Sequence, residues 1–298
     1  MPDKPTTAAG YRPDQVELVR ATCLYVATKL GDLMDELVVV GGLVPSLLVD
    51  QRALPPGVDA HVGTMDLDVG LTIGLLDQGR YRTLTERLRR AGFSPDENEL
   101  GRPTRQRWKI EGAGKATVDF LIAPSRKGDR GGMLRDIEKD FAAIIAPGLR
   151  LAFQDRSRIT LAGRTIRGEQ ATREVWVCGA GAYVVLKALA FASRGENKDA
   201  YDLCYVLRNC GSGPPDVAAR LRPLLADPDA VDALDVLRRD FLEHDGVGPL
   251  GDVEFDLPQC LPDVGRSHLI SPPVPPRGGG TRGVAKGSVE GRCVFRAV

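Results

Sequence analysis

Two aspartates in the segment Met65-Asp66-Leu67-Asp68-Val69 constrain the fold and the chemistry of this chain more than any other feature. The alternation of apolar and polar residues over 65–73 predicts a β-strand, and strand residues two positions apart point to the same face. Asp66 and Asp68 would then share one surface while Leu67 packs into the core. Adjacent carboxylates repel each other, and a hard cation such as Mg²⁺ takes carboxylate oxygens as ligands. The pair therefore predicts a metal site, with Asp66 and Asp68 as its ligands.

A second signal lies upstream, where the short apolar strand 38–40 runs into Gly41 and Gly42. A short helix is expected to follow over residues 43–50. A glycine pair after a strand lets backbone N–H groups approach a phosphate closely. Combined with the aspartate pair, it predicts a metal-dependent enzyme that handles a nucleoside triphosphate.

Asp119 is a lone acid inside the apolar strand expected over residues 116–122. Burying an unpaired carboxylate in such a strand would be costly. If this strand lies beside 65–73, three carboxylates converge, and the third helps to position an attacking hydroxyl and a second metal ion. The alternative is that Asp119 is a salt-bridged acid of an edge strand.

A second group of charged residues lies on two expected helices, 179–193 and 198–209. Lys187 falls among the core positions of the first helix, so it either reaches the triphosphate and neutralises developing charge or extends its ammonium to solvent. Arg194, at the break between the helices, is assigned the same task or a contact with nucleic acid. The second helix opens with three more charged residues, Lys198, Asp199 and Asp202.

In this order, the motifs resemble the nucleotidyltransferase superfamily of DNA polymerase beta and the minimal nucleotidyltransferases. The lysine-bearing helix followed by Lys-Asp-x-Tyr-Asp resembles the AbiEii/MenT family, the toxins of toxin–antitoxin and phage-defence systems. The resemblance covers residues 36–210. It implies catalytic roles for Asp66, Asp68, Asp119, Lys187 and Asp202. It implies nucleotide binding by Gly41, Gly42, Thr64, Lys187, Arg194, Lys198 and Asp199.

The activity that the resemblance implies is the transfer of a nucleoside monophosphate from an NTP, with Mg²⁺ or Mn²⁺ bound and pyrophosphate leaving. The expected acceptor is the 3′ end of tRNA, and a cognate antitoxin is an expected partner. Two alternatives stay open. One is an antibiotic nucleotidyltransferase with an acidic pocket around Asp240, Glu243 and Asp245. The other is a non-catalytic scaffold that binds a nucleotide or an antitoxin.

The expected fold is α+β, with a mixed β-sheet core flanked by helices and a helical C-terminal domain. The domains are an N-terminal helix over 1–35, a nucleotidyltransferase core over 36–170, a helical domain over 171–258 and a disordered tail over 259–298, which is rich in Pro, Gly, Ser and Arg. Other expected elements are helices over 13–35, 80–91, 133–145, 216–225 and 229–243, a loop over 51–62, short strands and turns over 149–177, and a hairpin of strands 107–110 and 116–122.

The formal net charge is zero, so contact with RNA would need a local basic patch. The candidate patch combines the helix 80–91 with the residues after it: Arg80, Arg82, Arg87, Arg89, Arg90, Arg102, Arg105, Arg107 and Lys109. The alternative is an ordinary solvated helix face.

The six cysteines are scattered and form no C-x-x-C pair, which indicates reduced thiols. The N-terminus lacks the apolar stretch of a signal peptide, and the longest apolar run, 37–49, is too short to span a bilayer. The expectation is a cytoplasmic protein that does not contact membranes.

Overall fold

The computed structural model describes residues 5, 10–72 and 80–241, so the expected tail over 259–298 lies outside the described residues. The strands are β1 (Leu37–Val40), β2 (Asp66–Leu71), β3 (Ser94–Glu97), β4 (Pro103–Glu111), β5 (Lys115–Ile122), β6 (Leu134–Glu138), β7 (Phe141–Ile145), β8 (Arg156–Arg164) and β9 (Gln170–Cys178). The helices are α1 (Pro13–Leu30), α2 (Val44–Leu48), α4 (Arg80–Arg90), α5 (Leu151–Gln154), α6 (Ala180–Arg194), α7 (Asn197–Asn209), α8 (Pro214–Leu221) and α9 (Pro228–Phe241).

One mixed sheet organises the first two thirds of the described chain. Its strand order is β3-β4-β5-β2-β1-β9-β8, and the β6–β7 hairpin joins through the pairing of β7 with β5. β2 runs parallel to β5 and antiparallel to β1, while β1 runs parallel to β9. The strands that carry the sequence motifs, β1, β2 and β5, are therefore neighbours at the centre of the sheet. This mixed sheet with flanking helices fits the expected α+β class.

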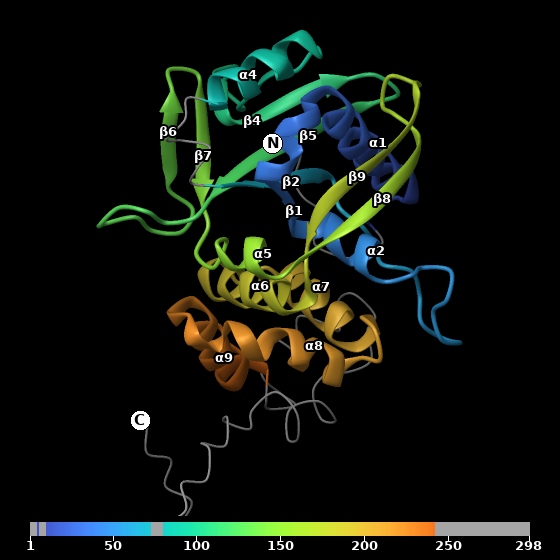
Figure 1. Cartoon of the computed structure of the whole chain (residues 1–298), viewed down its shortest axis with the longest axis vertical. Helices are drawn as coiled ribbons and strands as arrows, with labels where there is room; N and C mark the ends of the chain where they lie inside the picture. Colours follow the sequence, from blue (N-terminus) through green and yellow to red (C-terminus); the bar gives the residue numbers. More distant parts are fainter. Residues whose placement is uncertain (1–4, 6–9, 73–79, 242–298) are drawn as a thin grey trace, which may run out of the picture.

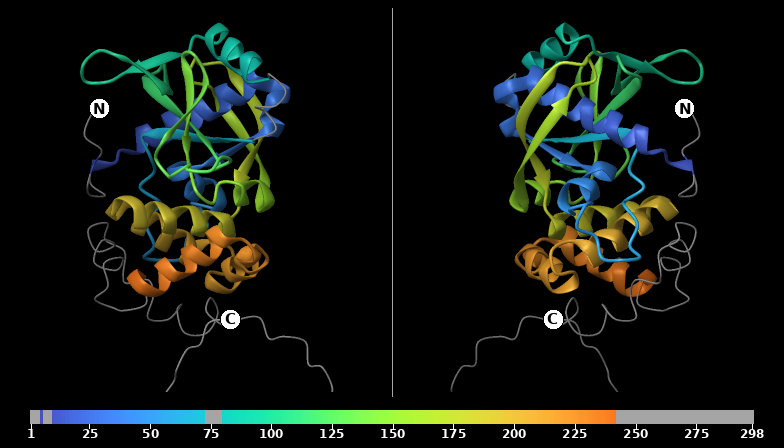
Figure 2. Two further views of the ribbon diagram at one scale, coloured as in Figure 1. Left: turned by 90° about the vertical axis from the view of Figure 1, so that its left-hand side faces the viewer. Right: turned by 90° about the vertical axis from the view of Figure 1, so that its right-hand side faces the viewer.

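Helices cover the sheet from two sides. α1 packs against α4, β8 and β9, whereas α6 packs against α7, α8 and α9 to form a separate helical layer. Figure 1 shows α6–α9 gathered beneath the sheet, with α1 and α4 at the opposite end of the molecule. The side views in Figure 2 show the segment after α2 running down from the sheet half to the helical layer. None of the described helices is long and apolar enough to cross a membrane.

Local chemistry explains where several elements begin and end. Pro13 starts α1, where its missing N–H would have no intrahelical partner, and Gly31 ends it with a φ of +58°. The helix expected over 13–35 therefore stops at Leu30, and a 3₁₀ helix continues to Glu36. Likewise, α8 ends at Leu221 rather than at residue 225, because Pro223 cannot continue the α-helical hydrogen bonds.

The helix expected over 133–145 was wrong, because this segment forms the β6–β7 hairpin. Phe141–Ile145 is nearly all buried, and its backbone pairs with β5 on one side and β6 on the other. A short buried strand and one face of a helix give similar apolar runs, so periodicity alone did not separate them.

The sheet also extends further along the chain than expected. Residues 149–177, expected as short strands and turns, contain two nine-residue strands, β8 and β9, in a regular antiparallel pair. Because β9 runs to Cys178 and pairs with β1 at Val177, the sheet passes the boundary expected at residue 170, and the helical layer begins at Ala180.

Candidate functional site

The turn after β1 lies directly against the Asp-x-Asp strand. Val40 is the register partner of Asp68, so Gly41 follows at the carboxylate, with a φ of +69°. A Cβ on Gly41 would overlap the carboxylate of Asp68, and a Cβ on Gly42 would fall 2.8 Å from the side chain of Thr64. Only glycine fits at Gly41 without displacing Asp68, so the glycine pair and the aspartate pair lie directly against each other.

Asp66, Asp68 and Asp119 converge as predicted, and we call them, with Arg107, the sheet acid cluster. Asp68 pairs in register with Asp119 across the parallel strands β2 and β5, and Leu67 is fully buried on the other face. Thr117 Oγ1 donates a hydrogen bond to Asp66 Oδ1 at 2.5 Å. Asp66 and Asp119 are buried, whereas Asp68 is only partly buried.

Arg107 was wrongly assigned to an exposed basic patch. It lies opposite Asp119 on β4 and is 8% exposed. Its Nε and Nη2 atoms donate to the two oxygens of Asp119 at 2.7 and 2.5 Å, and Nη2 also reaches Asp66 Oδ2 at 3.2 Å. Burial alone would lower the pKa of Arg107, but Asp119 and Asp66 raise it above its ordinary value. Asp119 is thus a salt-bridged acid of a central strand, not of an edge strand.

The donor set of the sheet acid cluster decides how a metal ion would fit. The described residues contain no group of three or more His, Cys, Asp or Glu side chains placed to hold a metal ion. Arg107 engages both oxygens of Asp119 and one oxygen of Asp66, and Asp66 and Asp68 share one face of β2. Two carboxylates fit a Mg²⁺ site whose remaining oxygen ligands come from water and substrate phosphates.

The second group of charged residues also comes together, and we call it the helical charge cluster: Lys187, Arg194, Lys198, Asp199 and Asp202. Lys187 Nζ lies 2.8 Å from Asp199 Oδ1 and 2.7 Å from Asp202 Oδ2. Arg194 donates to both oxygens of Asp199 at 2.6 and 2.8 Å, and Lys198 pairs with Asp202 one turn further along α7. Asp199 and Asp202 are fully buried. Lys187 therefore joins α6 to α7 and does not extend to solvent.

Burial and charge act in opposite directions on the pKa values of this cluster. Burial disfavours the charged form of Lys187, but Asp199 and Asp202 raise its pKa above the ordinary value. For Lys198 burial prevails and lowers the pKa to about 8. Burial would raise the pKa of Asp202, but Lys187 and Lys198 hold it well below the usual range. Asp202 thus stays ionised wherever the protein is folded near neutral pH.

His61 is a functional candidate that the sequence analysis missed. Its Nε2 lies 2.7 Å from Asp202 Oδ1, and the Gly63 N–H donates to its Nδ1 at 3.0 Å. Because Nδ1 accepts that bond, the ring proton lies on Nε2 and points to Asp202. Tyr201 and Tyr205 pack against the ring, with centroids 5.1 and 4.9 Å away.

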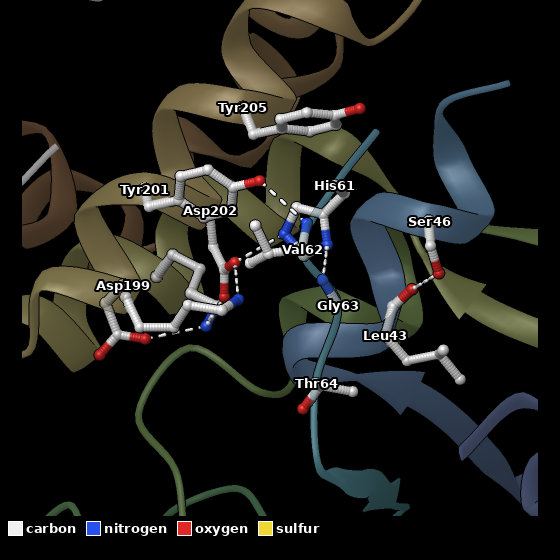
Figure 3. Close-up of polar contacts among 12 residues, drawn as sticks. Leu43, Ser46, His61, Val62, Gly63, Thr64, Asp199, Tyr201, Asp202 and Tyr205 are labelled. Atoms are coloured by element: carbon white, nitrogen blue, oxygen red, sulfur yellow. Dashed lines mark hydrogen bonds and ion pairs between the residues drawn. The ribbon is translucent and has the colours of Figure 1, made fainter. Parts of the chain in front are cut away.

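The His61 contacts tie the loop before β2 to α7, as Figure 3 shows. The Val62 N–H donates to Tyr201 Oη at 3.0 Å and adds a second connection. Burial lowers the pKa of His61 to about 4, so the ring is neutral near pH 7. A lone histidine in a proline-rich loop has no periodic pattern, so only its nearness to Asp202 in space reveals it.

A cavity of about 350 Å³ lies between the sheet and α6. Its polar lining comes from both halves: Gly41 and Asp68 from the sheet side, and Lys187 and Arg194 from α6. The rest of the wall is mainly apolar and includes Leu121, Ile144, Pro147, Leu149, Leu186 and Leu189. Of the residues singled out from the sequence, these four line the cavity. The others stand beside or behind them: Gly42, Thr64, Asp66, Asp119, Lys198, Asp199 and Asp202.

The arginines of α4 do not form a free basic patch. Each of them is paired with an acid: Arg80 with Asp32 and Glu36, Arg82 with Glu138, Arg87 with Asp32, Arg89 with Asp140 and Arg90 with Glu86. Arg105 and Lys109 also face acids, on β6 and β3. The local positive charge is therefore much smaller than the sequence cluster suggested.

The acidic pocket considered for an antibiotic acceptor gains no support. Asp240 is paired with Arg239, and Glu243 and Asp245 lie outside the described residues.

Comparison with known proteins adds no assignment. No protein-family model matches the sequence, and no curated protein matches it at a significant level. The function is therefore inferred from the chain's own residues and their geometry.

Proposed function

We propose that this protein is a metal-dependent nucleotidyltransferase that transfers a nucleoside monophosphate from an NTP to an acceptor. The observation that carries the proposal is the cavity shared by both halves, with Asp68 and Gly41 on one wall and Lys187 and Arg194 on the other. Its volume lies within the range of small-molecule sites, which are mostly apolar with a few placed polar groups. The mainly apolar wall suits a nucleoside, and the charged walls suit its phosphates.

Each wall has a separate task in this proposal. Asp66 and Asp68 hold Mg²⁺ or Mn²⁺, which when bound neutralises charge on the phosphoryl oxygens. Gly41 and Gly42 bring the backbone close to the phosphate chain, beside Thr64. Lys187 and Arg194 stabilise the negative charge that develops as pyrophosphate leaves.

The remaining site residues position these groups. Asp199 and Asp202 fix Lys187 with two ion pairs, and Asp199 also holds Arg194 in a bidentate contact. Arg107 holds Asp119 and also reaches Asp66, and none of these three residues is part of the cavity lining. In this role Asp119 orients Arg107, and Arg107 in turn orients the metal-binding carboxylate of Asp66.

For the acceptor we propose RNA, most specifically the 3′ end of tRNA, as the resemblance to AbiEii/MenT toxins implies. The supporting observation is the loop before β6, which carries Arg126, Lys127 and Arg130, all exposed and without an acid partner among the described residues. The loop continues into Gly131 and Gly132, which line the cavity. Cations at the rim of the site would attract a polyanionic strand. A toxin role with a cognate antitoxin is part of the same proposal.

The test is a labelling assay. Purified protein is incubated with total tRNA, Mg²⁺ and each α-labelled NTP in turn, beside Asp68→Ala and a control variant, Asp136→Ala. Asp136 is an exposed acid of β6 that pairs with Arg105, away from the cavity lining. We expect label on tRNA from at least one NTP with the wild type and the control, and none with Asp68→Ala. Label on no RNA with any NTP would contradict the tRNA acceptor.

A further inference from the structure

Tyr183 is a cavity residue to which neither the sequence motifs nor the proposed mechanism gives a task. It lies on α6 one turn before Lys187, is fully buried and lines the cavity. Its Oη atom is buried and makes no hydrogen bond within the described part of the chain. Lys187 Nζ lies 5.9 Å from the centre of its ring.

A buried hydroxyl without a partner is unusual, because it loses its bonds to water and gains none in return. Other buried tyrosines of this chain are satisfied: Tyr25 Oη donates to Ala91 O at 2.9 Å, and Tyr205 Oη donates to Gln51 Oε1 at 3.1 Å. A second unpartnered neutral donor, Trp108 Nε1, is not part of the cavity lining. Tyr183 therefore combines an unpartnered donor with an adjoining space for a ligand.

The surroundings of Tyr183 indicate what it would bind. Burial raises the pKa of its hydroxyl well above the ordinary value, and Asp202, Asp199 and Asp68 raise it further. The group therefore stays protonated near neutral pH and needs an acceptor. Lys187 lies on the same face of α6, and it lines the cavity together with Arg194.

We propose that Tyr183 Oη donates a hydrogen bond to a phosphate oxygen of the bound NTP. This inference rests on the proposed function, since it needs a triphosphate in the cavity. An anionic phosphate oxygen held by Lys187 and Arg194 is the acceptor that this cavity favours, and a hydrogen bond to a charged acceptor is stronger than one between neutral groups. The missing partner of the hydroxyl is then supplied by the substrate.

The test compares Tyr183→Phe with Tyr25→Phe, each of which removes one buried hydroxyl. The probes are inorganic triphosphate with Mg²⁺ and each NTP with Mg²⁺, and the readouts are the Kd by calorimetry and the Tm of the ligand-free protein. Tyr183→Phe should weaken triphosphate binding about tenfold, the usual effect of one hydrogen bond to a charged group. Its Tm should stay equal or rise, because no protein contact is lost. Tyr25→Phe should lower the Tm and leave the Kd unchanged.

Three results would overturn the inference. Equal triphosphate affinity of Tyr183→Phe and the wild type would remove Tyr183 from the phosphate site while leaving the proposed function intact. Weaker binding of NTPs but unchanged binding of inorganic triphosphate would place the hydroxyl against the nucleoside instead. No binding of any of these ligands by the wild type would overturn both the inference and the proposed function.

Discussion

The sheet acid cluster and the helical charge cluster meet at the same cavity, which the first lines with an acid, Asp68, and the second with two cations, Lys187 and Arg194. In the sheet acid cluster three carboxylates surround a single guanidinium, that of Arg107, which pairs with Asp66 and Asp119. In the helical charge cluster three cations meet two carboxylates, which leaves one positive charge within the cluster, and Arg194 also lies 3.6 Å from Glu196, an exposed acid outside it. The first cluster keeps Asp68 partly exposed, whereas the acids of the second are fully buried.

We interpret this difference as one of role: the sheet acid cluster binds a ligand, and the helical charge cluster holds the cations of the opposite wall in place. In the proposed mechanism the sheet acid cluster supplies the carboxylates that hold the metal ion, with Asp68 lining the cavity. The helical charge cluster is balanced almost within itself, and its hydrogen bonds fix where Lys187 and Arg194 lie. A metal–triphosphate complex, with a cation on one side and an anion on the other, matches both walls at once.

The largest expected effect comes from removing the carboxylate of the sheet acid cluster that lines the cavity. Asp68→Asn should reduce nucleotide transfer about ten-thousandfold, because a metal ligand contributes several kcal/mol to the stabilisation of the transferring phosphoryl group. Its free energy of unfolding should change much less than that of a variant in the helical charge cluster, because Asp68 is only partly buried. Rates from the labelling assay and urea unfolding measure the two quantities. A strongly destabilised Asp68→Asn variant would show that the sheet acid cluster, like the helical charge cluster, supports the fold.

A substitution in the helical charge cluster should instead act mainly on the stability of the fold. Asp202→Asn leaves the buried Lys187 and the partly buried Lys198 without their shared counter-charge, so the free energy of unfolding should fall by about 3–5 kcal/mol. As a matched control, Asp14→Asn removes an exposed partner of Arg12 and should change stability by about 1 kcal/mol or less. Urea unfolding of both variants at pH 7 measures the difference. Equal stabilities would show that the helical charge cluster does not support the fold.

A third effect depends on pH and sharpens the contrast further. The pKa of His61 is about 4 in the folded protein against an ordinary 6.5, so the unfolded chain binds a proton first as the pH falls. Stability should therefore decline from pH 6.5 towards pH 4, by about 3 kcal/mol from this group. His61→Gln retains a donor for Asp202 but cannot titrate, so its decline should be smaller. Urea unfolding at pH 7, 5.5 and 4.5 tests this, and identical slopes would exclude His61 as the cause.

The smallest expected effect concerns the rim of the cavity. Replacing Arg126, Lys127 and Arg130 with alanine should weaken tRNA binding about tenfold and reduce the salt dependence by about two to three counterions. The control is Arg82→Ala/Arg90→Ala on α4, where both arginines are already paired with acids. Binding titrations at several salt concentrations measure both. A larger loss in the control would restore α4 as the RNA-binding surface.

The centre of the site was predictable because its signals are local. Alternation around Leu67 fixes the shared face of Asp66 and Asp68, and the strand signal at 116–122 places Asp119 on a candidate neighbour. Helical spacing likewise brings Lys198 and Asp202 together, and they do pair.

What sequence reasoning missed depends on contacts between distant segments. Arg107 looks like any arginine of a basic run until β4 pairs with β5 and sets it opposite Asp119. His61 is recognised as a site residue only from its contact with Asp202 on α7, which lies 141 residues further along the chain. The β6–β7 hairpin was mistaken for a helix because its pairing with β5 is also non-local.

Gly41 and Asp68 also set a limit on how this chain can vary. The carboxylate of Asp68 occupies the space that any side chain at position 41 would need, and the backbone there has a left-handed φ. Alanine at position 41 would displace Asp68 even though it brings no charge of its own. Substitutions at positions 41 and 68 should therefore reduce activity to a similar extent, because both disturb the same carboxylate. A deep mutational scan should show equally low tolerance at the two positions.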